Sequence, residues 1–303
     1  MRKEWLVALV QQARTDKGIY LLVGDVGYGL VEPFRDEFPD RFINCGIAEQ
    51  NMVGVATGLA LSGKTVFVYS LSNFVTFRCL EQIRNDVCYH KANVKIVCSG
   101  GGLSYGNLGM THHTIQDLAI MRCLPNMTVE VPSEGWAAAQ ATEAIAQMSG
   151  PCYLRLERDG ETVLPLRNED YTIGKASTFA HRNGSDVMLI ATGGIVANAL
   201  HAVRKLKAEG IKATVVDMHT IKPLDEDVIQ SANRILTIEE HSIVGGLGSA
   251  VAEVLAEDGG VRFHRLGLND CFCHEVGDQE YLRAKHHLSI DAIVSSAEGL
   301  IEE

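Results

Sequence analysis

Short apolar segments alternate with helical segments along the first half of the chain. The apolar segments are rich in Val, Ile and Leu, which is typical of buried strands, and they span residues 18–25, 41–46, 64–70, 92–99, 128–132 and 152–157. Helical periodicity is predicted for an amphipathic N-terminal segment that ends near Gly18, and for residues 49–62, 74–89 and 133–148. Strands that alternate with helices predict a mostly parallel sheet with helices on both faces.

The alternation stops in a polar, turn-rich segment after residue 157 and resumes after residue 185. Further strands are predicted at 186–193, 211–219 and 234–241, and further helices at 198–210 and 245–259. We therefore expect an α/β protein with two domains, each a mostly parallel sheet with helices on both faces. The expected division is residues 1–160, a linker at 161–185 with room for a hairpin, and residues 186–303.

The composition is that of an ordinary globular protein. Of the 303 residues, 46% are hydrophobic and 21% are charged. This length and hydrophobic content are sufficient for two domains, each with its own core. The formal net charge of -11 argues against nucleic acid or an anionic membrane as the main partner. No segment reaches the roughly 18 apolar residues of a membrane span. Eight scattered cysteines in mostly apolar surroundings are typical of reduced thiols, so we expect a cytoplasmic protein.

Loops that follow strands are the informative segments, because parallel sheets bind ligands at the carboxyl ends of their strands. Four such loops lie at 23–29, 45–51, 69–77 and 98–114. In the second loop, Glu49 stands at the first turn of a helix that is otherwise almost entirely apolar and small. An acid there can interact with the helix dipole, but a helix this apolar is predicted to be buried, and a buried carboxylate needs a partner.

Several segments together resemble a known family. The stretches FPDRFINCGIAEQNMVGVATGLALSGK, SNFVTFRCLEQIRND and GMTHHTIQDLAIMRCLPNMTVEVPSE resemble the pyrimidine-binding domain of transketolases. In the second half, IKPLDEDVI and EEHSIVGGLGSAVAE resemble the C-terminal domain of the same family. The resemblance covers nearly the whole chain in order. It implies that thiamine diphosphate binds between two domains, of which this chain supplies the one that holds the aminopyrimidine.

The resemblance also implies roles for residues near the cofactor. Glu49 matches the glutamate that hydrogen-bonds a pyrimidine nitrogen and favours the imino tautomer, whose nitrogen removes the thiazolium proton. Burial would raise the pKa of such an acid, and the helix N-terminus would lower it. Phe74 and Phe77 match aromatic positions that pack on the aminopyrimidine, although core packing also explains two Phe at helical spacing. Asp25 matches an acid near the cofactor.

On the substrate side, His112 matches the histidine that faces the reacting carbonyl, where it would move a proton or bind an oxyanion. His113 stands where the family often has Gln. Arg158 matches an arginine that binds a substrate phosphate, and a solvated linker charge explains it equally well. Leu108 replaces an Asp that reads a substrate hydroxyl, and Gly100 stands where a substrate-binding His is expected. These departures leave a modified sugar, a deoxy-sugar or a different acceptor open.

The Gly-Asp-Gly motif that begins the family's metal site is missing from the sequence. The resemblance therefore implies the C-terminal section of a split transketolase, whose partner chain binds the diphosphate and holds Mg²⁺ or Ca²⁺. We expect no activity from this chain alone, a heterotetramer of two of each subunit, and no metal ligands here. Cys271–His274 is weak evidence for a metal site, and Gly245–Ser249 is better explained by a tight turn than by a phosphate loop.

The expected function is transfer of a two-carbon ketol unit between a ketose and an aldose that are phosphorylated or modified sugars. Alternatives among thiamine enzymes are a 1-deoxyxylulose-5-phosphate synthase-like enzyme and the beta subunit of a 2-oxo acid dehydrogenase. An alternative of another class is a non-catalytic regulatory chain. The presence of the matching residues Glu49, Phe74, Phe77 and His112 argues against it.

Overall fold

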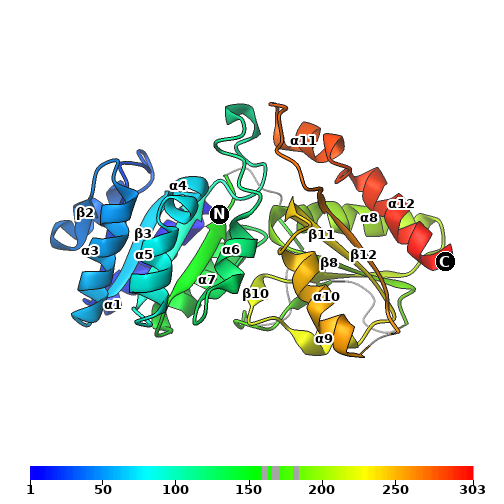
Figure 1. The fold of residues 1–303 in the computed structure, drawn as a ribbon, viewed down its shortest axis with the longest axis horizontal. Coiled ribbons are helices and arrows are strands. Elements are labelled where there is room, and N and C mark those ends of the chain that lie inside the picture. Colours follow the sequence, from blue (N-terminus) through cyan, green and yellow to red (C-terminus); the bar gives the residue numbers. More distant parts are fainter. Residues whose placement is uncertain (159–162, 166–170, 180–183, 259, 303) are drawn as a thin grey trace.

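The computed structural model describes residues 1–158, 163–165, 171–179, 184–258 and 260–302. Two sheets lie side by side, and each is flanked by helices (Figure 1). The expected α/β class, with two mostly parallel sheets covered by helices, is confirmed. No helix among the described residues is both long enough and apolar enough to cross a membrane.

The first sheet has seven strands in the order β10-β5-β6-β4-β3-β1-β2. The strands are β1 (Ile19–Val23), β2 (Phe42–Asn44), β3 (Thr65–Leu71), β4 (Val94–Ser99), β5 (Thr128–Glu130), β6 (Cys152–Leu156) and β10 (Thr220–Lys222). Neighbouring strands pair in parallel, except that β10 comes from the second half of the chain and pairs antiparallel with β5. The two halves of the chain therefore share one sheet.

Helices cover both faces of this sheet. One face carries α1 (Arg2–Thr15), α2 (Glu32–Glu37) and α7 (Gly135–Gln147), and the other carries α3 (Glu49–Leu61), α4 (Ser72–Phe77) and α6 (Asp117–Cys123). Because alternate strand residues point to opposite faces, Phe67 of β3 packs in the first layer and Val68 packs in the second. The segment predicted as one helix at 74–89 is instead divided among α4, α5 (Leu80–Gln82) and a π-helical turn (Ile83–Cys88).

Within this single chain, the helix after Glu49 is buried on one side only. Met52, Val53 and Ala56 of α3 pack against the sheet and are fully buried. The opposite side is open, since Leu61 is 61% exposed, and Ile47, just before the helix, is 81% exposed. The apolar composition of this helix therefore exceeds what this chain alone can bury.

The second sheet has five strands in the order β12-β11-β8-β9-β7. The strands are β7 (Ser177–Phe179), β8 (Val187–Ala191), β9 (Ala213–Asp217), β11 (Arg234–Ser242) and β12 (Arg262–Leu268). All pairs are parallel except β7 with β9, and β7 lies inside the segment predicted as a linker. One face packs on α8 (Val196–Ala208) and α12 (Ile290–Glu302), and the other packs on α9 (Glu226–Gln230) and α10 (Leu247–Asp258).

The core is continuous between the two sheets. Met188 and Val216 of the second sheet belong to the same buried cluster as Leu118 and Met121 of α6. A further helix, α11 (Gln279–Lys285), follows β12 and lies close to the loop between β4 and α6 (Figure 1). The carboxyl ends of the first sheet and the start of α11 thus border a common region.

Candidate active site

Glu49 lies at the carboxyl ends of three neighbouring strands. Its side chain is 1% exposed and packs against the turn after β1, where a Cβ on Gly24 would lie 3.4 Å from its Cγ. Ser70, at the end of β3, donates a hydrogen bond from its hydroxyl to Oε1 at 3.4 Å. Arg78 donates from Nη1 to Oε2 at 2.6 Å. The buried carboxylate therefore has the charged partner that its burial requires.

Arg78 also lies over an aromatic ring. Its guanidinium carbon is 4.9 Å from the centroid of the Phe74 ring. A flat, hydrogen-bond-donating group is thus held between the Phe74 ring and the Glu49 carboxylate. The Arg78 side chain is 46% exposed, so this position borders solvent. The arrangement suits any flat nitrogen heterocycle that can share a proton with an acid.

Phe77 lies one helical turn from Phe74 and is 40% exposed. The two rings line a cavity of about 520 Å³, together with Met110, Ile115 and Phe272 among others. The cavity reaches from α4 to the segment before α11, so both halves of the chain contribute to it. A residue of the hydrophobic core would be buried, so core packing does not explain Phe77, which is exposed.

Asp25 follows β1 and has a left-handed backbone with a φ of 55°. Its Oδ1 accepts hydrogen bonds from the Tyr28 hydroxyl at 2.7 Å and from the Asn44 amide at 3.0 Å. These two hydrogen bonds, that of Asn44 first, hold the pKa of the Asp25 carboxyl below its usual range. In this chain the carboxylate therefore joins the ends of β1 and β2, where Asn44 in turn accepts from the Gly46 N–H at 3.0 Å.

His112 meets the same aromatic ring as Arg78. The His112 and Phe74 rings are edge to face, with centroids 5.4 Å apart. Nδ1 of His112 is 3.0 Å from the hydroxyl of Thr111, and burial lowers the pKa of the imidazole below the ordinary histidine value. Asn73 donates to the carbonyls of Thr111 at 2.9 Å and His113 at 3.1 Å, which fixes the backbone on either side of His112.

Tyr105 occupies the space that a side chain at position 100 would need. Gly100 has a φ of +92°, and a Cβ there would lie 2.3 Å from Cδ2 of Tyr105. The Tyr105 ring is edge-on to His112, with centroids 6.3 Å apart, and the Arg158 guanidinium lies 5.8 Å from its centroid. Tyr105 thus stands between the two predicted substrate residues, whereas Leu108 is 54% exposed.

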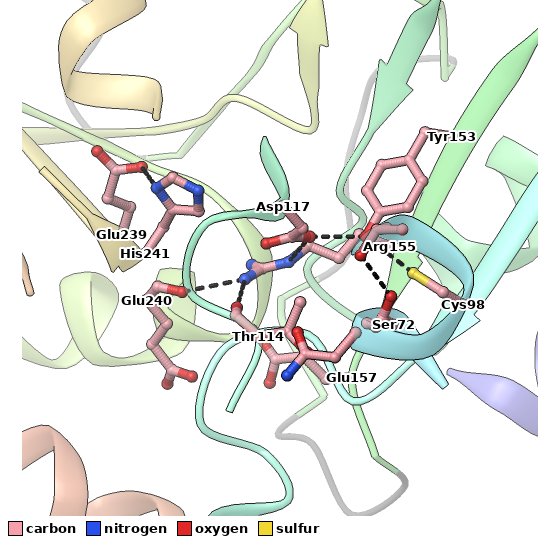
Figure 2. A network of polar contacts seen from close by, with 12 residues as sticks. Ser72, Cys98, Thr114, Asp117, Tyr153, Arg155, Glu157, Glu239, Glu240 and His241 are labelled. Carbon is pink, nitrogen blue, oxygen red and sulfur yellow. Dashed lines mark hydrogen bonds and ion pairs between the residues drawn. The ribbon is translucent and has the colours of Figure 1, made fainter. Parts of the chain in front are cut away.

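A buried polar network fixes the site loop, residues 100–114, against the second sheet (Figure 2). Arg155 of β6 forms an ion pair with Asp117 at 2.9 Å. Its Nη2 donates to the carbonyls of Thr114 at 2.7 Å and Glu240 at 3.0 Å. The Glu240 carboxylate accepts from the N–H of Leu103 at 2.9 Å. The loop that carries His112 is therefore held from both sheets.

Arg78 and Tyr105 were not among the predicted site residues. Arg78 directly follows Phe77 in the stretch quoted for the resemblance, so its neighbour was the available signal. The only sign of Tyr105 in the sequence was the glycine at position 100. The two residues come into contact because the loop turns between them. The sequence-predicted residues Glu49, Phe74 and His112 lie together through shared contacts.

The arrangement of two mostly parallel sheets covered by helices is that of the domains of a thiamine-diphosphate enzyme family, the transketolases. The family model described as "Transketolase, pyrimidine binding domain" matches residues 1–160, and that described as "Transketolase, C-terminal domain" matches residues 176–293. The chain belongs to the transketolase family, as the sequence resemblance indicated.

Three relatives resemble the chain over most of its length. The 6-deoxy-6-sulfo-D-fructose transketolase subunit SqwH of a Clostridium species is 39% identical, over 100% of this chain and 94% of that protein. One of the subunits of the apulose-4-phosphate transketolase of Actinobacillus succinogenes is 38% identical, over 89% of this chain and 88% of that one. A solved split-gene transketolase, described as an inactive beta4 tetramer, superposes with a TM-score of 0.89 at 37% identity, over 99% and 97% of the two chains.

Proposed function

We propose that this chain is the C-terminal subunit of a split transketolase and completes its active site only with a diphosphate-binding subunit. The observation that carries the proposal is the placement of Arg78 between Glu49 and Phe74. The guanidinium is flat, donates a hydrogen bond to the acid and lies on the ring, as the aminopyrimidine of the cofactor would. The residues present therefore fit that part of thiamine diphosphate.

Thiamine diphosphate, when bound, supplies the nucleophilic carbon that takes up the two-carbon unit. Glu49 then holds a proton at the pyrimidine nitrogen, since a buried acid is a poor place for an unshared charge. Phe74 orients the ring by stacking, and Phe77 excludes water from the cavity beside it. Arg78 leaves the face of Phe74 when the cofactor enters. Asp25 keeps the ends of β1 and β2 in register beside the cofactor.

The substrate lies on the other side of Phe74, next to His112. The lowered pKa of His112 keeps its imidazole neutral near pH 7, so it can accept a proton from a sugar hydroxyl or donate a hydrogen bond to the reacting oxygen. Arg158 pairs with an anionic group of the sugar, and Tyr105 spaces that group from His112. At position 100, where the family has a substrate-binding His, this chain has a glycine, and the Tyr105 ring fills the space of the missing side chain. This difference supports a donor or acceptor sugar other than the ordinary pentose phosphates.

The need for a partner is supported by three features. The Gly-Asp-Gly metal motif of the family is missing from the chain, so Mg²⁺ or Ca²⁺ is held by the partner. The open side of α3 leaves Ile47 and Leu61 exposed, which suits contact with another subunit. The split-gene relative assembles as an inactive tetramer of one subunit type. We infer a heterotetramer of two of each chain, assembled in the cytoplasm.

The test is reconstitution with the diphosphate-binding chain of the same source, which its Gly-Asp-Gly motif identifies. The assembled enzyme is supplied with Mg²⁺, thiamine diphosphate and either xylulose 5-phosphate with an aldose, or pyruvate with an aldehyde. We expect ketol transfer without release of CO₂, and Glu49→Gln should lower its kcat at least about 100-fold. The control Glu81→Gln alters an exposed acid and should keep full activity. Full activity of Glu49→Gln, or CO₂ release from pyruvate, would contradict the proposal.

A further inference from the structure

A cysteine, a glutamate and a histidine meet beside α11. Cys273 and Glu275 lie in the segment between β12 and α11, and His286 directly follows α11. One Sγ, one carboxylate oxygen and one imidazole nitrogen from these residues lie within 4.8 Å of one another. In the sequence, only the segment Cys271–His274 was considered as a metal site. Of that segment, only Cys273 belongs to the cluster in the structure. This distance suits atoms that surround one ion.

The donor set is chemically selective. Thiolate sulfur and imidazole nitrogen are the usual ligands of Zn²⁺ and related transition metals, whereas Mg²⁺ and Ca²⁺ prefer oxygen alone. Cys273 is 1% exposed, and Nε2 of His286 is buried without a hydrogen-bond partner among the described residues.

A second histidine, His113, lies beside this cluster, on the lining of the cavity that Cys273 also borders. Nε2 of His113 is 3.0 Å from the carbonyl of Gly106, and a carbonyl can only accept, so Nε2 carries the proton. Nδ1 is buried without a hydrogen-bond partner within the described part of the chain. Ligating histidines commonly donate their other ring N–H to a backbone carbonyl in this way. His113 and Cys273 line the same cavity of about 520 Å³.

We propose that Cys273, Glu275 and His286 bind one Zn²⁺ ion, with the fourth coordination position left to water. The site joins the segment before α11 to the end of that helix. The Gly277 N–H already donates to the carbonyl of Gly106 at 3.4 Å, so the same segment contacts the site loop. A metal here holds the second half of the chain against the loop that carries His112. It is distinct from the Mg²⁺ of the cofactor, which takes oxygen ligands.

The experiment uses the full chain, purified without chelator and then treated with one. We expect about one equivalent of Zn²⁺ before treatment by elemental analysis. Titration of the metal-free chain with Co²⁺ should give a thiolate charge-transfer band in the near ultraviolet, and Zn²⁺ should abolish it while excess Mg²⁺ should not. Cys273→Ser should abolish the band, and Glu275→Gln, at an exposed position, should weaken Co²⁺ binding at least about tenfold. The control Cys271→Ser alters the neighbouring exposed thiol and should keep both the band and the affinity.

The shift in Tm that Zn²⁺ causes is a second measurement of metal binding, and it also shows whether each variant is folded. Zn²⁺ should raise the Tm of the wild type and of Cys271→Ser, and it should leave the Tm of Glu275→Gln nearly unchanged at the same concentration. A missing charge-transfer band in the wild type would overturn the proposal. So would an unchanged affinity in Glu275→Gln, or loss of the band in Cys271→Ser alone. These experiments measure metal binding and not ketol transfer, so their outcome does not depend on whether the proposed function is correct.

Discussion

Replacing Gly100 with alanine tests the geometry of the substrate end of the site. The substitution has two separate effects. A residue with a Cβ is strained at a φ of +92°, and the new Cβ would lie 2.3 Å from Cδ2 of Tyr105. Gly63 offers a matched control, because its φ is +85° and no atom lies within 4 Å of the position of an added Cβ. Comparing the two variants isolates the clash with Tyr105.

The expected magnitudes differ enough to be measured. The left-handed backbone costs an alanine about 1–2 kcal/mol, which applies to both variants. Displacing the half-buried Tyr105 ring adds about 1–3 kcal/mol, which applies only to Gly100→Ala. Gly63→Ala should therefore lower the free energy of unfolding by about 1–2 kcal/mol, and Gly100→Ala by about 2–5 kcal/mol. In a Tyr105→Ala background the difference between the two glycine variants should disappear.

Urea unfolding followed by tryptophan fluorescence supplies the assay. The chain has two Trp residues, and Trp5 is fully buried and stacked on Tyr69 of β3 with centroids 4.8 Å apart, so its emission reports the first sheet. Equal losses of stability in Gly100→Ala and Gly63→Ala would refute the reasoning. The Tyr105 ring would then not occupy the space beside position 100, and its assignment as a substrate-spacing residue would fail.

Three further predictions concern the network and the substrate residues. Asp117→Asn should lower the free energy of unfolding by about 3–5 kcal/mol, because it leaves the buried Arg155 charge without its partner, whereas Glu37→Gln on an exposed pair should barely move the urea midpoint. Because burial lowers the pKa of His112, the acidic limb of kcat/KM that His112→Gln removes should lie below about pH 6.5, and a limb above that value would contradict the assignment. Arg158→Gln should raise the KM of a phosphorylated sugar about tenfold or more and leave that of its unphosphorylated analogue unchanged, and an equal change in both would exclude a phosphate contact.

Most of the first sheet could be predicted because its strands are buried runs of β-branched residues. Val66 and Val68 in β3 and Ile96 in β4 predict strands directly, since their neighbours are apolar too. The strand β10 was missed because it has three residues and gains its partner, β5, from the other half of the chain. The strand β12 was missed because it is an edge strand whose exposed residues, Arg262, His264 and Arg265, make the segment polar.

Some residues of the candidate site could also be predicted from the sequence, and others could not. Glu49 and His112 stand in contiguous motifs, so a family resemblance could point to them. The partner of Glu49 could not be read from the sequence, because Arg78 reaches it only after α3 and α4 pack on the same face of the sheet. Cys273 and His286 meet only because α11 returns the chain to the segment before it. Contacts between elements decide these cases, and local patterns do not encode them.

Calorimetric titration of thiamine diphosphate with Mg²⁺ tests the central claim most directly. The titration is made on this chain alone and then on its complex with the diphosphate-binding chain. The account predicts no measurable heat of binding for the isolated chain, because it holds only the pyrimidine end of the site, and tight Mg²⁺-dependent binding for the complex. Tight Mg²⁺-dependent binding by the isolated chain would contradict the claim that the active site is shared between two subunits.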